Sequence, residues 1–299
     1  MAWIERYTVP FKSTPYEFHL HGISDLQIGS SSTSVSKIKE RVREIVADPI
    51  DSGIIIPGDI EDEDRPSTRA IRRSAFSDRE EVISRDAKKH MRFIDDEIIP
   101  ILLPLQKTKY GIMGVLAGHH WTQLSPALNS VEYICNRLTG ISKKKVNYLG
   151  QMMSYMDMTF QMPGKSIRKL IHVQHGEGGG QTKASSINKL DRTAQGFDGH
   201  VFIRAHDCQI ITSKTDRLYP KLDRGGGREP ELLHHTTVLL NLGAATRGYE
   251  IGKGSPSYIE QKMLRPVTLG WGTVKFRFKK ALASEDKDHN VKCDIRVEI

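Results

Sequence analysis

Nine side chains that bind metals or move protons stand just after apolar, strand-like runs of this sequence. They comprise carboxylates, imidazoles, an amide and a thiol: Asp25, Gln27, Asp59, Asp62, His119, His120, His175, His206 and Cys208. Together they include nearly every side-chain type that binds transition metals. A single one of them is most simply a turn residue, because Asp favours turns where strands end. Five strand ends that each carry such a residue indicate a shared site, since these ends converge on one edge of an alternating sheet.

The elements that would position these residues alternate along the first two-thirds of the chain. Apolar runs that predict strands cover residues 16–25, 52–59, 109–120, 166–176 and 199–212, the last with a polar interruption. Between them, apolar residues recur at helical spacing or in helix-like segments.

Helices are expected over 34–48, 125–138 and 182–196, and a capping-box pattern at Ser77 and Glu80 opens another. From about Arg228 onward the pattern changes to strands joined by turns, with no long helix between them. A single α/β domain with two sheets, spanning residues 1–299, is the simplest interpretation.

Bulk composition excludes several classes of protein. The hydrophobic content of 38% and charged content of 27% are typical of a soluble globular protein. No run of 18 apolar residues is present, and residues 1–12 lack the apolar core of a signal peptide. Three widely spaced cysteines predict no disulfide framework. We therefore expect a cytoplasmic protein that does not contact a membrane.

The net charge of +8, with a pI near 9.3, favours an anionic partner. Most of the Lys and Arg residues are spread along the chain, and spread basic charge is usually solvated surface. Charge alone therefore gives nucleic-acid binding only modest weight.

The nine side chains belong to five short motifs. In chain order these read DLQ at Asp25–Gln27, GDIED at Gly58–Asp62, GHH at Gly118–His120, HG at His175–Gly176 and AHDC at Ala205–Cys208. This ordered set resembles the motifs of the calcineurin-like metallophosphoesterase superfamily, which are D-x-H, G-D-x-x-N/D, G-N-H-D/E, an isolated His and G-H-x-H. The resemblance covers about residues 17–216, and the segment HGEGGGQT…GFDG is similar to phage-type members.

The resemblance implies an α/β fold, a four-layer αββα sandwich of two mixed β-sheets flanked by helices. The β-rich part from about 228 to 299 would complete the second sheet. The resemblance also implies two metal positions that share Asp59. One would take Asp25, Gln27, Asp59 and Cys208, and the other Asp59, His119, His175 and His206.

Substitutions distinguish the two implied metal positions. At the second, His119 stands where the family has an amide, so three imidazoles and a carboxylate suit Zn, Fe, Mn or Ni. At the first, Gln27 and Cys208 replace both imidazoles; an amide is a weak ligand and a thiol binds only as thiolate. We expect one secure divalent transition-metal site and a second that is weakened or altered. Free cysteines are commonly buried as small hydrophobes, which is the competing interpretation of Cys208.

The resemblance also implies the catalytic roles. His120 would donate a proton to the leaving oxygen or bind phosphate, and Asp62 would hydrogen-bond His120 and fix its tautomer. The leading hypothesis is a metal-dependent phosphoesterase that hydrolyses a phosphodiester, in a nucleic acid or a nucleotide, as a nuclease or phosphodiesterase. The sequence leaves two alternatives open. One is a catalytically impaired member that binds nucleic acid or has a structural role, and the other is a phosphomonoesterase or protein phosphatase. The oligomeric state does not follow from the sequence.

Overall fold

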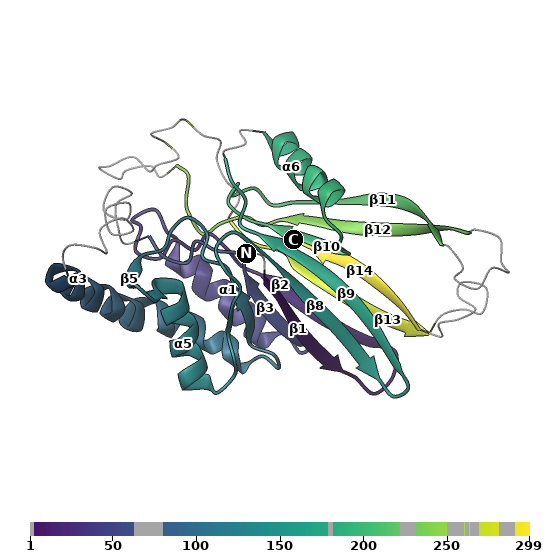
Figure 1. The fold of residues 1–299 in the computed structure, drawn as a ribbon, viewed down its shortest axis with the longest axis horizontal. Helices are drawn as coiled ribbons and strands as arrows, with labels where there is room; N and C mark the ends of the chain where they lie inside the picture. The colour runs from purple at the N-terminus through teal and green to yellow at the C-terminus, as the bar shows by residue number, and fades with distance from the viewer. Residues whose placement is uncertain are drawn as a thin grey trace.

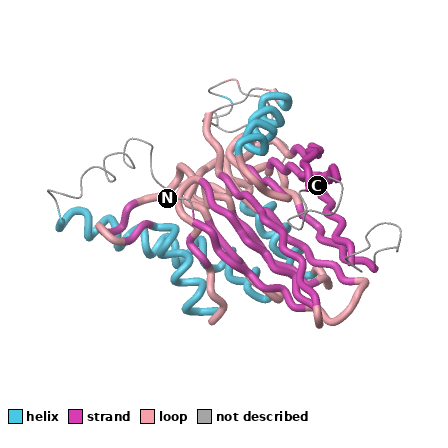
Figure 2. Tube along the Cα trace, turned by 45° about the vertical axis from the view of Figure 1, so that its right-hand side comes forward, coloured by secondary structure: helices cyan, strands magenta, loops and turns pink. Residues whose placement is uncertain are grey.

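Two six-stranded mixed sheets stack face to face in the computed structural model of this protein (Figure 1). The structure describes residues 3–62, 80–178, 182–221, 231–249, 269–280 and 291–299, together with Glu260 and Met263. Within these residues the expected α/β sandwich is confirmed, with helices on both sides of the paired sheets (Figure 2).

The first sheet, called here the β2 sheet, carries the first three motifs. Its order is β14 (Val291–Glu298), β13 (Thr273–Lys280), β2 (Tyr16–Gly22), β3 (Asp51–Ile56), β4 (Ile112–Val115) and β7 (Asn147–Tyr148). Strands β2, β3, β4 and β7 are parallel, and helical crossovers connect them as parallel pairing requires. The second half of strand β3, Ile54–Ile56, is a continuous apolar run because both faces of the sheet are covered there, and all three side chains are fully inaccessible.

The second sheet, called here the β8 sheet, carries the last two motifs. Its order is β1 (Trp3–Pro10), β8 (Met153–Met162), β9 (Lys165–Gln174), β10 (Val201–Arg204), β12 (Glu231–Asn241) and β11 (Ile211–Lys221). A small hairpin pairs β5 (Gln123–Ser125) with β6 (Leu128–Asn129). The run predicted as one interrupted strand over 199–212 is therefore wrong in detail. It comprises β10 and the start of β11, and the loop between them carries His206 and Cys208.

Helices cover the outer faces of both sheets. They are α1 (Val35–Ala47), α3 (Glu80–Phe93), η1 (Ile94–Ile98), α4 (Ile99–Leu102), η2 (Leu103–Lys107), α5 (Ser130–Ser142) and α6 (Lys183–Gly196). Helix α6 buries Leu190 and Ala194 against Phe202 and Leu239 of the β8 sheet. Of the predicted capping box, Glu80 begins α3, whereas Ser77 lies outside the described residues. No helix formed by the described residues is long and apolar enough to span a membrane.

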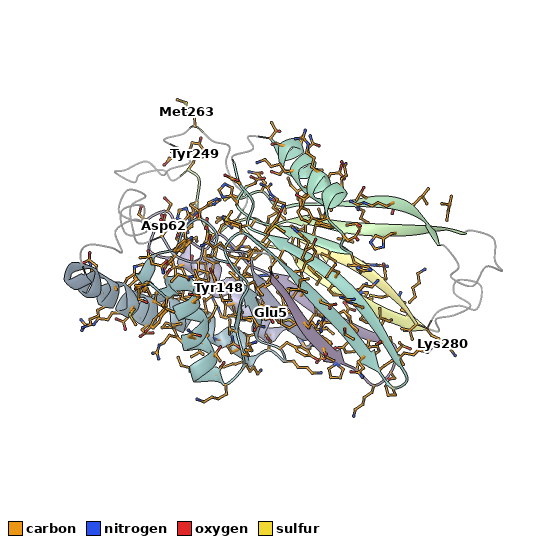
Figure 3. The ribbon with its side chains drawn as sticks, in the orientation of Figure 1. Glu5, Asp62, Tyr148, Tyr249, Met263 and Lys280 are labelled. Atoms are coloured by element: carbon orange, nitrogen blue, oxygen red, sulfur yellow. The ribbon has the colours of Figure 1, made fainter. Side chains whose placement is uncertain are left out.

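Aromatic side chains join the two sheets. The ring of Phe18 on β2 lies 5.6 Å from that of Phe160 on β8, and Phe160 lies 5.2 Å from Phe276 on β13. All three are fully buried, which fixes how the strand ends of one sheet face those of the other. Lys280 ends β13 on the side of the molecule away from Asp62, which follows β3 (Figure 3). The functional residues predicted from the sequence follow strands that end on the Asp62 side.

Candidate metal centre

Four of the predicted ligands meet at the carboxyl ends of strands from both sheets. Asp59 follows β3, His119 follows β4, His175 follows β9 and His206 follows β10. One ligand atom from each lies within 4.8 Å of the others. The three imidazole centroids are 4.7–5.2 Å apart in pairs. We call these four residues the central cluster.

Asp59 is fixed at the middle of the central cluster by hydrogen bonds to one of its oxygens. Its Oδ1 accepts from the backbone N–H groups of His119, at 2.6 Å, and of His120, at 2.9 Å. Its Oδ2 lies 3.1 Å from His175 Nε2. Since backbone donors occupy Oδ1, Oδ2 is the oxygen that faces the histidines.

His175 is oriented from its opposite ring nitrogen. Its Nδ1 lies 2.7 Å from the carbonyl oxygen of Pro57, so Nδ1–H donates there and Nε2 faces Asp59. The ring is completely buried, and Nε2 has no hydrogen-bond partner among the described residues. A histidine held from one nitrogen by a carbonyl, with the other turned into a cluster of ligands, is typical of metal-binding histidines.

Two motif glycines let the loops approach this closely. A Cβ on Gly118 would stand 2.3 Å from Asp59 Oδ1, and one on Gly58 would stand 2.7 Å from His175 Nδ1. Both glycines have positive φ, +75° and +108° respectively, which L side chains rarely adopt. The glycines of the GD and GHH motifs are therefore explained by packing around the central cluster.

Left-handed backbone is concentrated at the predicted site residues. Non-glycine residues with positive φ in the described chain include five of them: Asp25, Gln27, Asp59, His206 and Cys208. Such conformations cost about 1–3 kcal/mol each and persist where the surrounding structure requires them. The loops therefore hold these side chains in directions that relaxed turns would not provide.

Burial and neighbouring charges shift the pKa values of the residues in the central cluster in different directions. Burial alone would lower the pKa of His175, but the adjacent Asp59 carboxylate outweighs burial and raises that pKa to about 9. Burial would likewise raise the pKa of Asp59, yet His175 and the backbone donors hold it well below its usual range. Burial and the neighbouring His175 lower the pKa of His206 to about 4. A cation entering the cluster would therefore meet a carboxylate and a neutral imidazole, and would displace one proton from His175.

His120 and Asp62 lie beside the central cluster and contact each other, as expected. His120 Nδ1 is 2.9 Å from Asp62 Oδ1, and His120 Nε2 is 3.8 Å from Asp59 Oδ2. The side chain of His120 is 23% exposed, unlike that of Asp59 at 1%. His120 therefore faces solvent at the edge of the cluster with its ring orientation set by Asp62.

The other three predicted ligands adjoin the central cluster but are not members of it. Asp25 is buried and its Oδ2 accepts from the backbone N–H of His206 at 3.1 Å. Burial, assisted by the Asp59 charge, raises the pKa of Asp25 to about 6. Gln27 Oε1 accepts from the hydroxyl of Thr246 at 2.8 Å. Cys208 Sγ donates to the carbonyl of His206 at 3.4 Å, and burial raises the pKa of its thiol well above the usual value.

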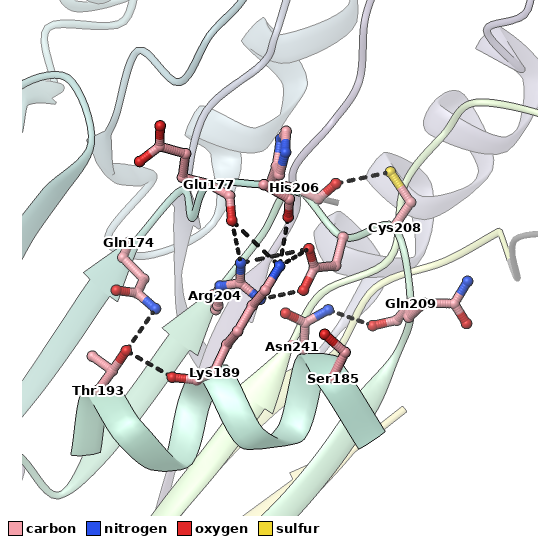
Figure 4. A network of polar contacts seen from close by, with 12 residues as sticks. Gln174, Glu177, Ser185, Lys189, Thr193, Arg204, His206, Cys208, Gln209 and Asn241 are labelled. Atoms are coloured by element: carbon pink, nitrogen blue, oxygen red, sulfur yellow. Dashed lines mark hydrogen bonds and ion pairs between the residues drawn. The ribbon is translucent and has the colours of Figure 1, made fainter. Parts of the chain in front are cut away.

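A buried ion pair that the sequence analysis missed holds the His206 loop. Arg204, at the end of β10, pairs with Asp207, and both side chains are at most 2% exposed. Figure 4 shows Arg204 beside Glu177 and Lys189. Lys189 of α6 reaches Asp207 Oδ1 at 3.4 Å and the carbonyl of Glu177 at 3.3 Å. The loop that follows His175 and the loop that bears His206 are thus tied together. The sequence signal that could have indicated this ion pair is the arginine that ends the apolar run VFIR.

Comparisons with known proteins do not decide the family. No family model matches the chain, and no curated protein matches it. Among solved structures, zinc-complexed wild-type Vps29 from Entamoeba histolytica is 12% identical over 93% of this chain and 98% of its own, with a TM-score of 0.32. A predicted phosphoesterase from Streptococcus pneumoniae is 12% identical over 94% and 98%, with a TM-score of 0.31. The calcineurin-like phosphoesterase YfkN from Bacillus subtilis is 9% identical over 95% and 91%, with a TM-score of 0.34. At such scores these likenesses carry no functional argument, which has to come from the site.

Proposed function

We propose that this protein is a metal-dependent phosphoesterase of the calcineurin-like type that hydrolyses an anionic phosphodiester. The observation that carries the proposal is the convergence of Asp59, His119, His175 and His206 within 4.8 Å at the ends of strands from two sheets. The ordered motifs that resemble those of the superfamily bring these same residues together.

The central cluster fits a divalent cation. One carboxylate oxygen and three imidazole nitrogens are the donors preferred by Zn, Mn, Fe and Ni. Among the described residues, His175 Nε2 contacts only Asp59 Oδ2, at 3.1 Å, and a cation would take the place of the proton between them. When bound, such a cation stabilises charge on the phosphoryl oxygens and activates water as the nucleophile.

Two side chains of the protein have distinct roles in the proposed reaction. Asp59 holds its charge in the buried centre because two backbone N–H groups fix its Oδ1. His120 can hold a proton on Nε2 while its Nδ1–H donates to Asp62 at 2.9 Å. A proton on Nε2 at the exposed edge of the cluster is placed to pass to a leaving oxygen.

The proposed substrate is a phosphodiester in a nucleic acid or nucleotide, and its support is electrostatic. The net charge of +8 favours approach of a polyanion.

The substituted residues of the first implied metal position support the alternative of a catalytically impaired protein. Its Gln27 and Cys208 make hydrogen bonds to Thr246 and to the His206 backbone.

Turnover of small aryl esters tests this proposal. Chelator-treated protein is assayed with bis-p-nitrophenyl phosphate and p-nitrophenyl phosphate, with Mn²⁺, Zn²⁺, Fe²⁺ or Ni²⁺ added. We expect the diester to be hydrolysed faster than the monoester, and Asp59→Asn to reduce turnover to background. Asp96→Asn is the matched control, since this exposed carboxylate lies on η1. If wild type and Asp59→Asn are equally inert with every metal while both bind oligonucleotides, the impaired alternative is correct.

A further inference from the structure

A second cluster of metal-binding side chains lies beneath α1, separate from the strand-end loops. His19 and His21 alternate with Phe18 and Leu20 along β2. Side chains two apart on a strand share a face. Because Phe18 contacts Phe160 of the β8 sheet, the two histidines face the opposite side, where α1 packs. Asp48, the residue that ends α1, completes what we call the strand–helix cluster.

One oxygen of Asp48 faces one nitrogen of each histidine. Asp48 Oδ2 lies 2.5 Å from His19 Nδ1 and 3.2 Å from His21 Nε2. All three atoms lie within 4.8 Å of one another. His19 and His21 are buried, at 6% and 4% exposed, while the side chain of Asp48 is 15% exposed.

His21 Nε2 is the atom that the protein alone does not satisfy. Despite its 3.2 Å approach to Asp48, the contact lacks the direction of a hydrogen bond, and Nε2 has no such partner among the described residues. Two ligand atoms on a tetrahedral zinc ion stand about 3.3 Å apart without bonding to each other, given zinc–ligand distances of about 2.0–2.1 Å. The 3.2 Å between His21 Nε2 and Asp48 Oδ2 is close to that spacing, whereas the 2.5 Å between His19 Nδ1 and Asp48 Oδ2 is that of a hydrogen bond, so these two atoms would move apart around an ion.

The opposite nitrogen of each histidine is held by an outer partner. His19 Nε2 is 2.8 Å from Glu17 Oε1, and His21 Nδ1 is 3.0 Å from Thr273 Oγ1. A ring held from outside by a carboxylate or hydroxyl, with its other nitrogen turned inward, is the arrangement that orients metal-binding histidines. It leaves the two inward nitrogens and Asp48 Oδ2 as a convergent set.

Acidic and basic side chains both surround the strand–helix cluster. Glu17 and Asp48 are acidic, and Asp48 lies at the carboxyl end of α1, where the helix dipole favours positive charge. Of the nearby arginines, Arg277 pairs with Glu17 at 3.1 Å. Arg41 pairs with Glu44 at 3.2 Å and also donates to Thr273 Oγ1 at 2.9 Å, so its positive charge lies beside the cluster.

We propose that His19 Nδ1, His21 Nε2 and Asp48 Oδ2 bind one divalent transition-metal ion of the zinc class, with solvent completing the coordination. The ion would replace the hydrogen bond between His19 and Asp48 and would anchor the end of α1 to β2. A proton shared by Glu17, His19 and Asp48 would explain the His19 contacts, but it would leave His21 Nε2 with only its 3.2 Å ion-pair contact to Asp48. This proposal is independent of phosphoester hydrolysis.

Metal stoichiometry in the full-length chain tests the proposal. Chelator-treated protein is titrated with Zn²⁺, and bound metal is measured after gel filtration for wild type, His21→Gln and Asp59→Asn. We expect His21→Gln to lose one bound equivalent, or to bind it at least 100-fold more weakly, and Asp59→Asn to retain that equivalent. His235→Gln, which removes a histidine of β12 outside both clusters, is the matched control. Equal stoichiometry and affinity in wild type and His21→Gln would overturn the proposal.

A measurement on the wild type covers the case in which His21→Gln does not fold. Anomalous diffraction from wild-type crystals soaked in Zn²⁺ should show a peak bounded by His19 Nδ1, His21 Nε2 and Asp48 Oδ2. No peak at that position, under soaking conditions that saturate the central cluster, would equally overturn the proposal.

Discussion

The central cluster and the strand–helix cluster use similar ligands on very different backbones. Asp59 and His206 of the central cluster sit in loops with φ of +55° and +79°. In the strand–helix cluster, His19 and His21 belong to a regular strand, and Asp48 has an extended backbone. The first cluster draws on strands from both sheets, the second on one strand and the helix that follows it.

This difference indicates what each cluster is suited to do. Strained loops at strand ends can aim several side chains at one point that a substrate can reach, and such strain is concentrated at functional sites. Ligands on a regular strand and at a helix end, buried under α1, can hold elements together but cannot offer a substrate much room. We therefore expect substitutions in the two clusters to affect different properties.

The largest effect that separates catalysis from metal binding is expected at His120. His120→Ala should reduce phosphodiester turnover about 10²–10⁴-fold, because it removes the proposed proton donor at the edge of the central cluster. Bound metal, measured by mass spectrometry, should stay at the wild-type amount because His120 is not a member of the central cluster. His235→Ala serves as the control for loss of an imidazole elsewhere. Loss of metal together with activity would assign His120 to the ligands.

A pair of glycines tests whether close packing maintains the central cluster. Gly118 and Gly164 have nearly the same φ, +75° and +76°, but a Cβ would meet Asp59 only at Gly118 and would meet nothing within 4 Å at Gly164. Both Ala variants should lose about 1–2 kcal/mol from backbone strain. Gly118→Ala should in addition lose about 100-fold in turnover through displacement of Asp59. Thermal unfolding and diester assays on both variants check this. Equal activity in the two would remove the packing explanation of the GHH motif.

The third prediction concerns stability in acid and a buried histidine that belongs to neither cluster, and it leaves activity at neutral pH unchanged. His172 is completely buried among Tyr155, Phe197 and Phe202, and neither ring nitrogen has a hydrogen-bond partner among the described residues. Burial lowers the pKa of His172 to about 4. As pH falls below about 6.5, the unfolded chain therefore binds a proton at this histidine and the folded chain does not. The free energy of unfolding is unaffected above pH 6.5 and decreases as pH falls toward 4, by up to about 3 kcal/mol.

His172→Phe should remove this acid sensitivity. Urea unfolding at pH 7, 5.5 and 4.5 should show a smaller loss of unfolding free energy with acidification in the variant than in wild type. The same loss of unfolding free energy in both proteins would show that burial of His172 does not cause the acid destabilisation.

The sequence predicts the central cluster because each ligand follows an apolar run in an ordered set of motifs. It does not predict the strand–helix cluster, because Asp48 is 27 residues from His21 in sequence and becomes its neighbour only when α1 packs on β2. Arg204 was missed for a different reason: Asp207 is only three residues away, but the sequence does not show that the two side chains are buried together as an ion pair.

The fold was predictable in class but not in every strand. Strands β1 and β8 were not predicted, in part because β8 carries Asp157, a buried carboxylate whose partner Arg168 lies on the neighbouring strand. The split of residues 199–212 between β10 and β11 depends on β11 reversing direction to pair with β12. The predicted ligand roles of Gln27 and Cys208 stay predictions. In the structure Gln27 accepts from Thr246 and Cys208 donates to the His206 carbonyl, and these contacts depend on loop conformations that residue spacing does not predict.

Anomalous diffraction at the absorption edge of manganese or zinc, from crystals grown with that metal, tests the central claim most directly. The account predicts a strong peak within about 2.0–2.3 Å of Asp59 Oδ2 and of a nitrogen from each of His119, His175 and His206. A saturating metal concentration that gives no peak among these four side chains would contradict it.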